Sequence, residues 1–160
     1  MSIVKLNNNG VKDATAFGSI TGLGNLILIK TQTASSSASV SFVDGASSVV
    51  LDNTYKEYIF YFNNIHGSAN ADPTFNLSTD GGSNYNVTKT TTTFAANHAE
   101  NDGEAALGYI ASTDLAQSTA FQQMNFDLDS GADSGCSGYL HLFEPSSTTF
   151  VKHFIMVNNG

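Results

Sequence analysis

Arginine and tryptophan are both missing from this sequence, and cysteine occurs only once. The cations are six lysines against fourteen carboxylates, which gives a formal net charge of -8 at pH 7. Because like charges repel, we expect the chain to avoid phosphate backbones and anionic lipid head groups, and therefore to bind no nucleic acid. Apolar runs such as YIFYF are too short to cross a bilayer, so we expect no membrane insertion and synthesis in the cytoplasm.

The single cysteine, Cys136, excludes an internal disulfide and leaves no second thiol to share a metal. We interpret it as a small buried or half-buried side chain. A length of 160 residues is sufficient for a core that needs no disulfide or metal. We therefore expect one domain, residues 25–160, preceded by an irregular N-terminal arm, residues 1–24, which has no sustained period of either kind.

Charged residues make up only 12% of the chain, whereas serine, threonine, asparagine and glycine are plentiful. This composition favours β-strands joined by tight turns, with at most a short helical turn near DLAQS. Turn chemistry in VDGAS, STDGGSN, DSGADSG and EPSST separates the strand-like runs. These runs are residues 25–33, 38–43, 48–52, 56–65, 74–78, 84–94, 104–112, 121–129, 138–144 and 150–157. Their number and spacing predict an all-β fold, an antiparallel β-sandwich of jelly-roll type.

The run TYKEYIFYFNNIHGS, residues 54–68, is apolar on both of its alternating faces. Tyr58, Phe60 and Phe62 share one face, whereas Ile59 and Tyr61 share the other. A strand with water on one side normally alternates apolar with polar residues. The second face therefore needs a cover, either a loop or the arm of the same chain, or a neighbouring copy. We favour the copy, because aromatic residues are enriched in the cores of interfaces.

Four histidines are the first candidates for chemistry, because imidazole titrates near neutrality and is the commonest metal ligand. They are His66, His98, His141 and His153. No pair has the HExxH or HxH spacing that would place two rings on one metal. We therefore expect them to pack in the core or an interface, with a ring nitrogen bonded to the backbone.

The carboxylates of DLDSGAD form the second candidate site. Asp127, Asp129 and Asp133 occupy the first, third and seventh places of a loop that resembles the start of a calcium-binding turn. The fifth place is Gly131 instead of a ligand, and no glutamate stands at the twelfth place. An ordinary turn between strands is therefore favoured over a calcium site, which stays open as the alternative.

No motif for catalysis is present. The chain has no GxSxG elbow, and neither GSITGLGN nor DGGSN matches a phosphate-binding glycine pattern. Glu100, Asp102 and Glu104 in HAENDGE are interpreted as a solvated acidic loop. We expect a protein that is not an enzyme, with no catalytic, cofactor-binding or metal-binding residues.

Four segments together resemble one family. They are MSIVKLNNNGVKD, FGSITGLGN, TYKEYIFYFNNIH and STDGGSNYNV, with a looser match in SGYLHLFEPSSTTFVKHF. This combination is similar to the small β-rich structural proteins of tailed bacteriophages, particularly those of marine bacteria. The resemblance implies a component of the virion, either a capsid decoration protein or a tail or fibre part, and it supplies no catalytic residues.

A jelly roll buries one face of each sheet, so the resemblance implies a homotrimer in which a neighbouring subunit covers the second aromatic face. The arm would attach the protein to other virion proteins by adding an edge strand. The alternative function is a tail-fibre or receptor-binding tip that recognises a host-surface glycan. Tyr85, Tyr109 and Tyr139 would then stack on sugar rings, although tryptophan, the usual platform, is missing.

Overall fold

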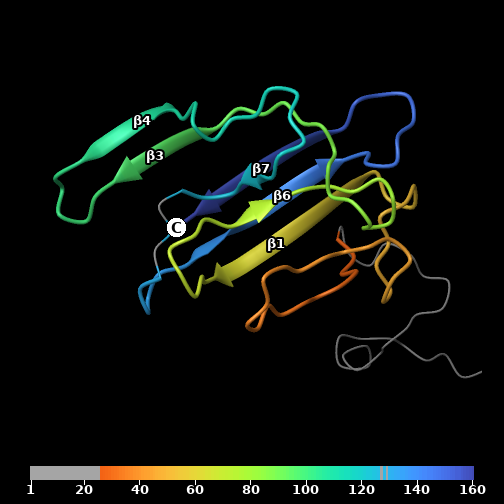
Figure 1. Ribbon diagram of the computed structural model, residues 1–160, viewed down its shortest axis with the longest axis horizontal. Helices are drawn as coiled ribbons and strands as arrows, with labels where there is room; N and C mark the ends of the chain where they lie inside the picture. Colours follow the sequence, from red (N-terminus) through yellow and green to blue (C-terminus); the bar gives the residue numbers. More distant parts are fainter. Residues whose placement is uncertain (1–25, 127, 129) are drawn as a thin grey trace, which may run out of the picture. The chain divides into compact units, whose positions relative to one another are not determined.

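The computed structural model describes residues 26–126, 128 and 130–160. The chain divides into two units, Met1–Thr31 and Gln32–Gly160, and all the strands belong to the second (Figure 1). Within the described ranges there is no helix, so the predicted all-β class is confirmed and the short helical turn near DLAQS is not formed. The arm predicted at residues 1–24 lies outside the described residues.

The largest element is an antiparallel sheet of three strands in the order β1-β6-β7. The strands are β1 (Glu57–Ile65), β6 (Cys136–Phe143) and β7 (His153–Asn159). The pairing of β1 with β6 is interrupted between Phe62 and Ile65, where Asn64 adopts a φ of 50°. The hydroxyl of Ser137 accepts the Asn64 backbone N–H at 2.9 Å, so the irregular position keeps a hydrogen bond.

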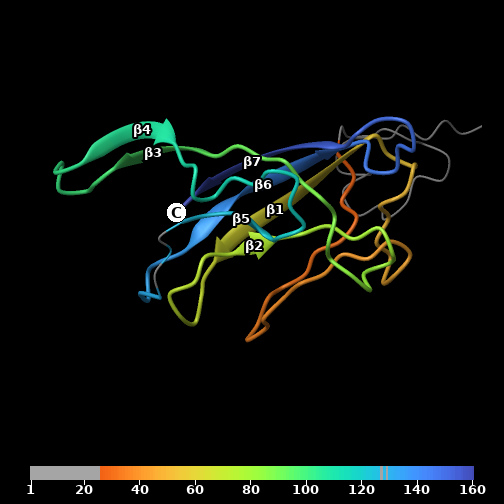
Figure 2. The same ribbon diagram turned by 45° about the horizontal axis from the view of Figure 1, so that its top comes forward.

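Two small ribbons complete the strands of the described chain. The short strands β2 (Thr74–Phe75) and β5 (Gln122–Gln123) pair with each other, and so do β3 (Phe94–His98) and β4 (Ala105–Tyr109). The turn between β3 and β4 is closed by a 2.8 Å bond from the Ala99 N–H to the Glu104 carbonyl. Figure 2 shows β2 and β5 close to the sheet and the β3–β4 hairpin extending beyond it.

The core lies on one face of the three-stranded sheet, which we call the core face. Its buried side chains include Tyr58, Cys136, Leu140 and Leu142, and the sheet is covered there by irregular chain and by β2. The ring of Phe42 meets Phe60 edge-on with centroids 5.6 Å apart, and the Phe75 ring meets Phe154 at 5.2 Å. Such edge-to-face contacts add to the apolar burial. The interpretation of Cys136 as a buried residue is therefore confirmed.

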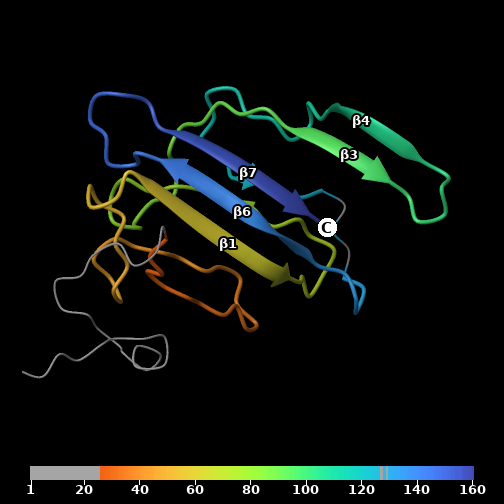
Figure 3. The ribbon, with the colours of Figure 1, turned by 180° about the vertical axis from the view of Figure 1, so that it is seen from behind.

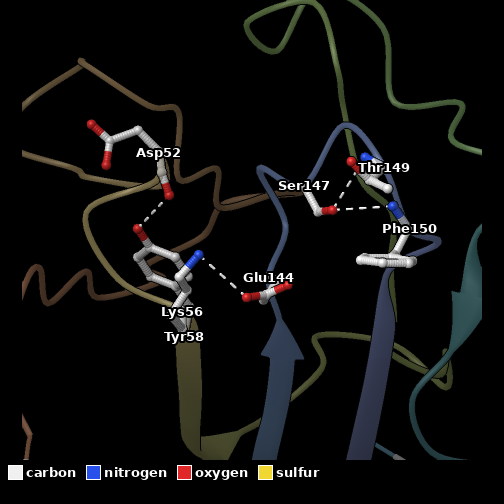
Figure 4. A network of polar contacts seen from close by, with 7 residues as sticks. All are labelled: Asp52, Lys56, Tyr58, Glu144, Ser147, Thr149 and Phe150. Atoms are coloured by element: carbon white, nitrogen blue, oxygen red, sulfur yellow. Dashed lines mark hydrogen bonds and ion pairs between the residues drawn. The ribbon is translucent and has the colours of Figure 1, made fainter.

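The start of β1 is held by local polar contacts (Figure 4). The Tyr58 hydroxyl donates to the Asp52 carbonyl at 2.9 Å, and burial raises the pKa of that hydroxyl. Lys56 forms an ion pair with Glu144 at 3.3 Å, where β6 ends. In the turn between β6 and β7, the Ser147 hydroxyl accepts two backbone N–H groups. These contacts fix the end of the sheet at which β1 and β7 begin.

Several predicted strands are absent. Residues 26–33, 38–43 and 48–52 form no strand, and of the run 84–94 only Phe94 belongs to one. In VDGAS the Asp44 side chain accepts the Leu51 N–H at 2.8 Å, and the chain folds back on itself. Side chain to backbone bonds of this kind compete with a strand ladder. The antiparallel strands therefore form one three-stranded sheet and two ribbons in the described chain.

Candidate functional site

Among the residues that the structure describes, the histidines and acidic residues singled out in the sequence do not assemble into one site. The His66 ring bonds the Ser134 backbone carbonyl at 2.7 Å, as predicted, but the residue is exposed and not packed in a core, and His98 pairs with Asp102. His141 pairs with a glutamate and His153 lies exposed on β7. Within the described ranges, no three histidine, cysteine or acidic side chains are grouped so that they could hold a metal. The same part of the chain contains no helix that is long and apolar enough to span a membrane.

The structure describes one of the two acidic segments completely and the other only in part. Asp127 and Asp129 of the calcium candidate lie outside the described residues, while Asp133 is exposed. The segment HAENDGE forms the turn between β3 and β4, and its carboxylates at Glu100 and Glu104 are exposed. The interpretation as a solvated acidic loop is confirmed.

The second face of the three-stranded sheet is not covered by any described residue of Gln32–Gly160, and we call it the open face. Figure 3 shows the three strands from this side. Cross-strand partners place its side chains in three full rows across β1, β6 and β7, and the polar pair Ser137 and Asn159 lies beyond the row of Tyr139. The rows are Tyr61, Tyr139 and Val157; then Ile59, His141 and Ile155; then Glu57, Phe143 and His153.

The open face is mainly apolar in its two middle rows. Tyr61 is 62% exposed, Tyr139 37%, Ile155 56% and Val157 48%. The Tyr61 and Tyr139 rings are neighbours, with centroids 6.3 Å apart. Solvent on this face would normally select polar residues at these positions. The open face therefore has the composition of a surface that another molecule covers.

The carboxylate and imidazole groups of the open face are those of Glu57 and His153 in its end row and of His141 in the next row. Glu57 is its only carboxylate, and its Oε2 lies 3.0 Å from Nε2 of His141. The His141 ring also stacks on Phe143, with centroids 4.0 Å apart. An exposed pair of this kind contributes about 0–1 kcal/mol to folding, so its more important effect is to leave the apolar rows without a single unpaired charge.

A second apolar surface lies on the β3–β4 hairpin. Phe94, Leu107 and Tyr109 share one face of the hairpin and are 71%, 82% and 48% exposed. The Tyr109 hydroxyl donates to the Asp114 carboxylate, which raises the pKa of Tyr109. The prediction of a strand at 104–112 did not identify this hairpin. The sequence pattern that could have indicated its apolar face is the alternation of Leu107 and Tyr109 with the small residues Ala106 and Gly108.

The sequence also gave no sign of a buried polar cluster beneath β5. Lys89 is buried and donates to the Asn76 side-chain oxygen at 2.5 Å and to the Val87 carbonyl at 2.9 Å. Burial lowers the pKa of Lys89. The Gln122 side-chain oxygen accepts the Thr91 hydroxyl at 2.6 Å. Since these groups satisfy one another, the cluster joins loops and offers no free group for catalysis.

Comparison with known proteins adds no relative. No protein-family model, no curated protein and no solved structure matches this chain.

Proposed function

We propose that this chain is a non-enzymatic structural protein of a bacteriophage virion, a capsid decoration protein that assembles with copies of itself as a homotrimer. The observation that carries the proposal is the open face, where exposed tyrosine, isoleucine and valine side chains cross all three strands. Such a surface fits a building block that is stable only when a neighbour covers it. It does not fit an enzyme, which needs convergent polar groups in a cleft.

The size of the open face supports self-association. Four of its side chains, Tyr61, Tyr139, Ile155 and Val157, expose roughly 300–500 Å² in total if a large side chain has an area of about 150–250 Å². The largest apolar patch on a typical monomer is about 300–600 Å² and is often functional. A standard interface buries about 800 Å² on each partner, about 57% of it apolar. The open face can therefore supply most of the apolar part of one such interface.

The jelly-roll architecture belongs to the same proposal. A sheet of three strands with only one covered face is half of a sandwich, and the layer that a neighbouring copy places on the open face would supply the other half. The virion assignment is supported by the segments MSIVKLNNNGVKD and TYKEYIFYFNNIH and their similarity to phage structural proteins. Attachment to other virion proteins would use residues 1–24.

A glycan-binding tip has weaker support. Tyr109 and Tyr139 are exposed, but they lie on the hairpin and on β6, and Tyr85 is half-buried in a loop. A sugar site needs its platforms to converge on one ligand.

Sedimentation velocity of the purified chain at micromolar concentration tests the assembly. We expect a species of three copies, and a compact monomer across the whole concentration range would refute the proposal. For the virion assignment, deletion of residues 2–10 should leave the melting temperature unchanged and abolish incorporation into particles. Normal incorporation of the truncated chain would show that the arm is not the attachment point.

A further inference from the structure

The β3–β4 hairpin has no partner among the strands of the described chain. β3 and β4 contact each other and no other strand, and the hairpin extends past the end of the sheet at which β7 ends (Figures 1 and 3). A two-stranded hairpin is at best marginally stable in water, and it gains stability when its apolar face packs on another layer. The face formed by Phe94, Leu107 and Tyr109 therefore needs a cover as much as the open face does.

Both surfaces carry charged residues at one end. The turn of the hairpin holds Glu100, Asp102 and Glu104, all exposed. In Gln32–Gly160, the exposed lysines of the described chain are Lys56 and Lys152, directly before β1 and β7. Glu57 and Glu144 lie at the same end of the sheet, and Lys56 is paired with Glu144. The charges therefore do not set the direction in which a hairpin lies on the sheet, and contact between the two surfaces depends on their apolar side chains.

The lengths of the two surfaces agree. On the sheet, the row of Tyr61 lies four residues from the row of Glu57, which is about 13 Å along a strand. On the hairpin, the Phe94 and Tyr109 pair lies four residues from the pair of His98 and Ala105, again about 13 Å, and the acidic turn follows. The apolar face of the hairpin and the apolar rows of the sheet therefore extend over similar lengths.

We propose that the apolar face of the β3–β4 hairpin of one copy docks on the open face of the sheet of a second copy. This inference rests on the self-association proposed above and names the element that covers the open face. The exposed apolar side chains of the two surfaces together amount to roughly 600–1,000 Å². At about 57% apolar area, that corresponds to an interface of roughly 1,050–1,750 Å², which overlaps the standard class of about 1,200–2,000 Å².

The contact joins two different surfaces, so it is heterologous. Copies joined by a heterologous contact form a closed ring when the rotations between them add up to a full turn. In a ring of three, each copy would contribute one hairpin and bind one hairpin. The proposed contact is therefore compatible with a homotrimer that has one kind of interface.

A matched pair of hairpin variants tests the docking. Leu107→Asp places a carboxylate on the apolar face, whereas Ala106→Asp places one on the other face of the same strand, and both residues are exposed. We expect L107D to weaken self-association at least about 30-fold in sedimentation, as for an interface hot spot, and A106D to leave it unchanged. Equal behaviour of the two variants would overturn the docking.

Cysteine pairing identifies the surface that receives the hairpin. In the alignment above, Leu107 opposes the row of Ile155, so L107C and I155C chains carrying different tags are mixed and oxidised. We expect a mixed disulfide between unlike chains, and none when L107C is mixed with S39C, an exposed site outside both surfaces. The native Cys136 is buried, and the wild-type chain serves as the control for its reaction.

The outcomes separate the two proposals. An oligomeric wild type that forms no mixed disulfide overturns the hairpin docking and leaves the proposed self-association standing. A monomeric wild type overturns both. A monomeric L107C/I155C chain that forms the disulfide within itself overturns the docking, because the hairpin would then cover its own sheet.

Discussion

Two adjacent residues on β1, Phe60 and Tyr61, should respond in opposite ways to the same substitution. Phe60 points to the core face, where its ring meets Phe42 and its cross-strand neighbour is the buried Leu140. Tyr61 points to the open face and is 62% exposed. A single step along the strand therefore separates a test of folding from a test of assembly.

Phe60→Asp should unfold the domain. Truncating a buried phenylalanine costs about 3–5 kcal/mol, and a carboxylate left without a partner among apolar side chains costs several kcal/mol more. Phe60 is half-buried, so the lower part of that range applies to its packing. Even so, the sum approaches the whole stability of a typical domain, about 5–15 kcal/mol.

Tyr61→Asp should leave the domain folded. The substitution loses the neighbouring Tyr139 ring, which is worth about 0.5–1.5 kcal/mol, and the new carboxylate stays in water. In the assembly, the same carboxylate would be buried under a neighbouring copy, which should raise the dissociation constant at least about 30-fold. Urea unfolding and sedimentation velocity on both variants measure the two effects.

Two results would refute this reasoning. If Tyr61→Asp loses as much stability as Phe60→Asp, the open face is covered within one chain. If Tyr61→Asp is folded and sediments like the wild type, the open face is not the surface of assembly.

Three further predictions follow from single residues. Gly138→Ala should weaken the β6–β7 pairing and lower the melting temperature, because its Cβ would lie 2.1 Å from the Val157 carbonyl oxygen; an unchanged melting temperature would contradict that packing. The Cys136 thiol should react with a disulfide reagent only in urea, because it is 1% exposed and burial raises its pKa; rapid labelling of the native chain would show that β6 opens readily. Asp80 has a pKa lowered from 3.8 to about 2, chiefly by its hydrogen bond from a serine hydroxyl, so its contribution to stability should be present above pH 3.8 and disappear as the pH falls toward 2. An NMR titration of the Asp80 carboxyl checks this value, with D80N as the control that lacks the transition, and a midpoint near 3.8 would show that the turn does not hold the carboxylate.

Local side-chain patterns were enough to predict the strands of the main sheet. The runs 56–65, 138–144 and 150–157 correspond to β1, β6 and β7. The turn in STDGGSN was also predicted correctly, since Gly81 and Gly82 adopt φ values of 69° and 82°. Strand alternation and glycine turns both depend on residues a few positions apart, so the sequence alone was enough to predict these elements.

The predicted strands at 38–43 and 48–52 show the limit of such patterns. Their alternation is compatible with a strand, but a strand needs a neighbouring strand for its backbone groups. Here Asp44 provides a local partner instead, and the segment packs as irregular chain with Phe42 against Phe60. Alternation measures the preference of the side chains and not the presence of a partner.

The sequence by itself determined the β class, the absence of any known catalytic motif and the presence of a strand with two apolar faces. Only the tertiary structure decided which of those faces is the core. That choice depends on β6, which lies far along the chain and pairs with β1, and on Phe42 and Phe75, whose rings meet the sheet from other segments. The burial of a side chain depends on the element that covers it. When that element comes from a distant part of the chain, the residues around the buried side chain do not predict it.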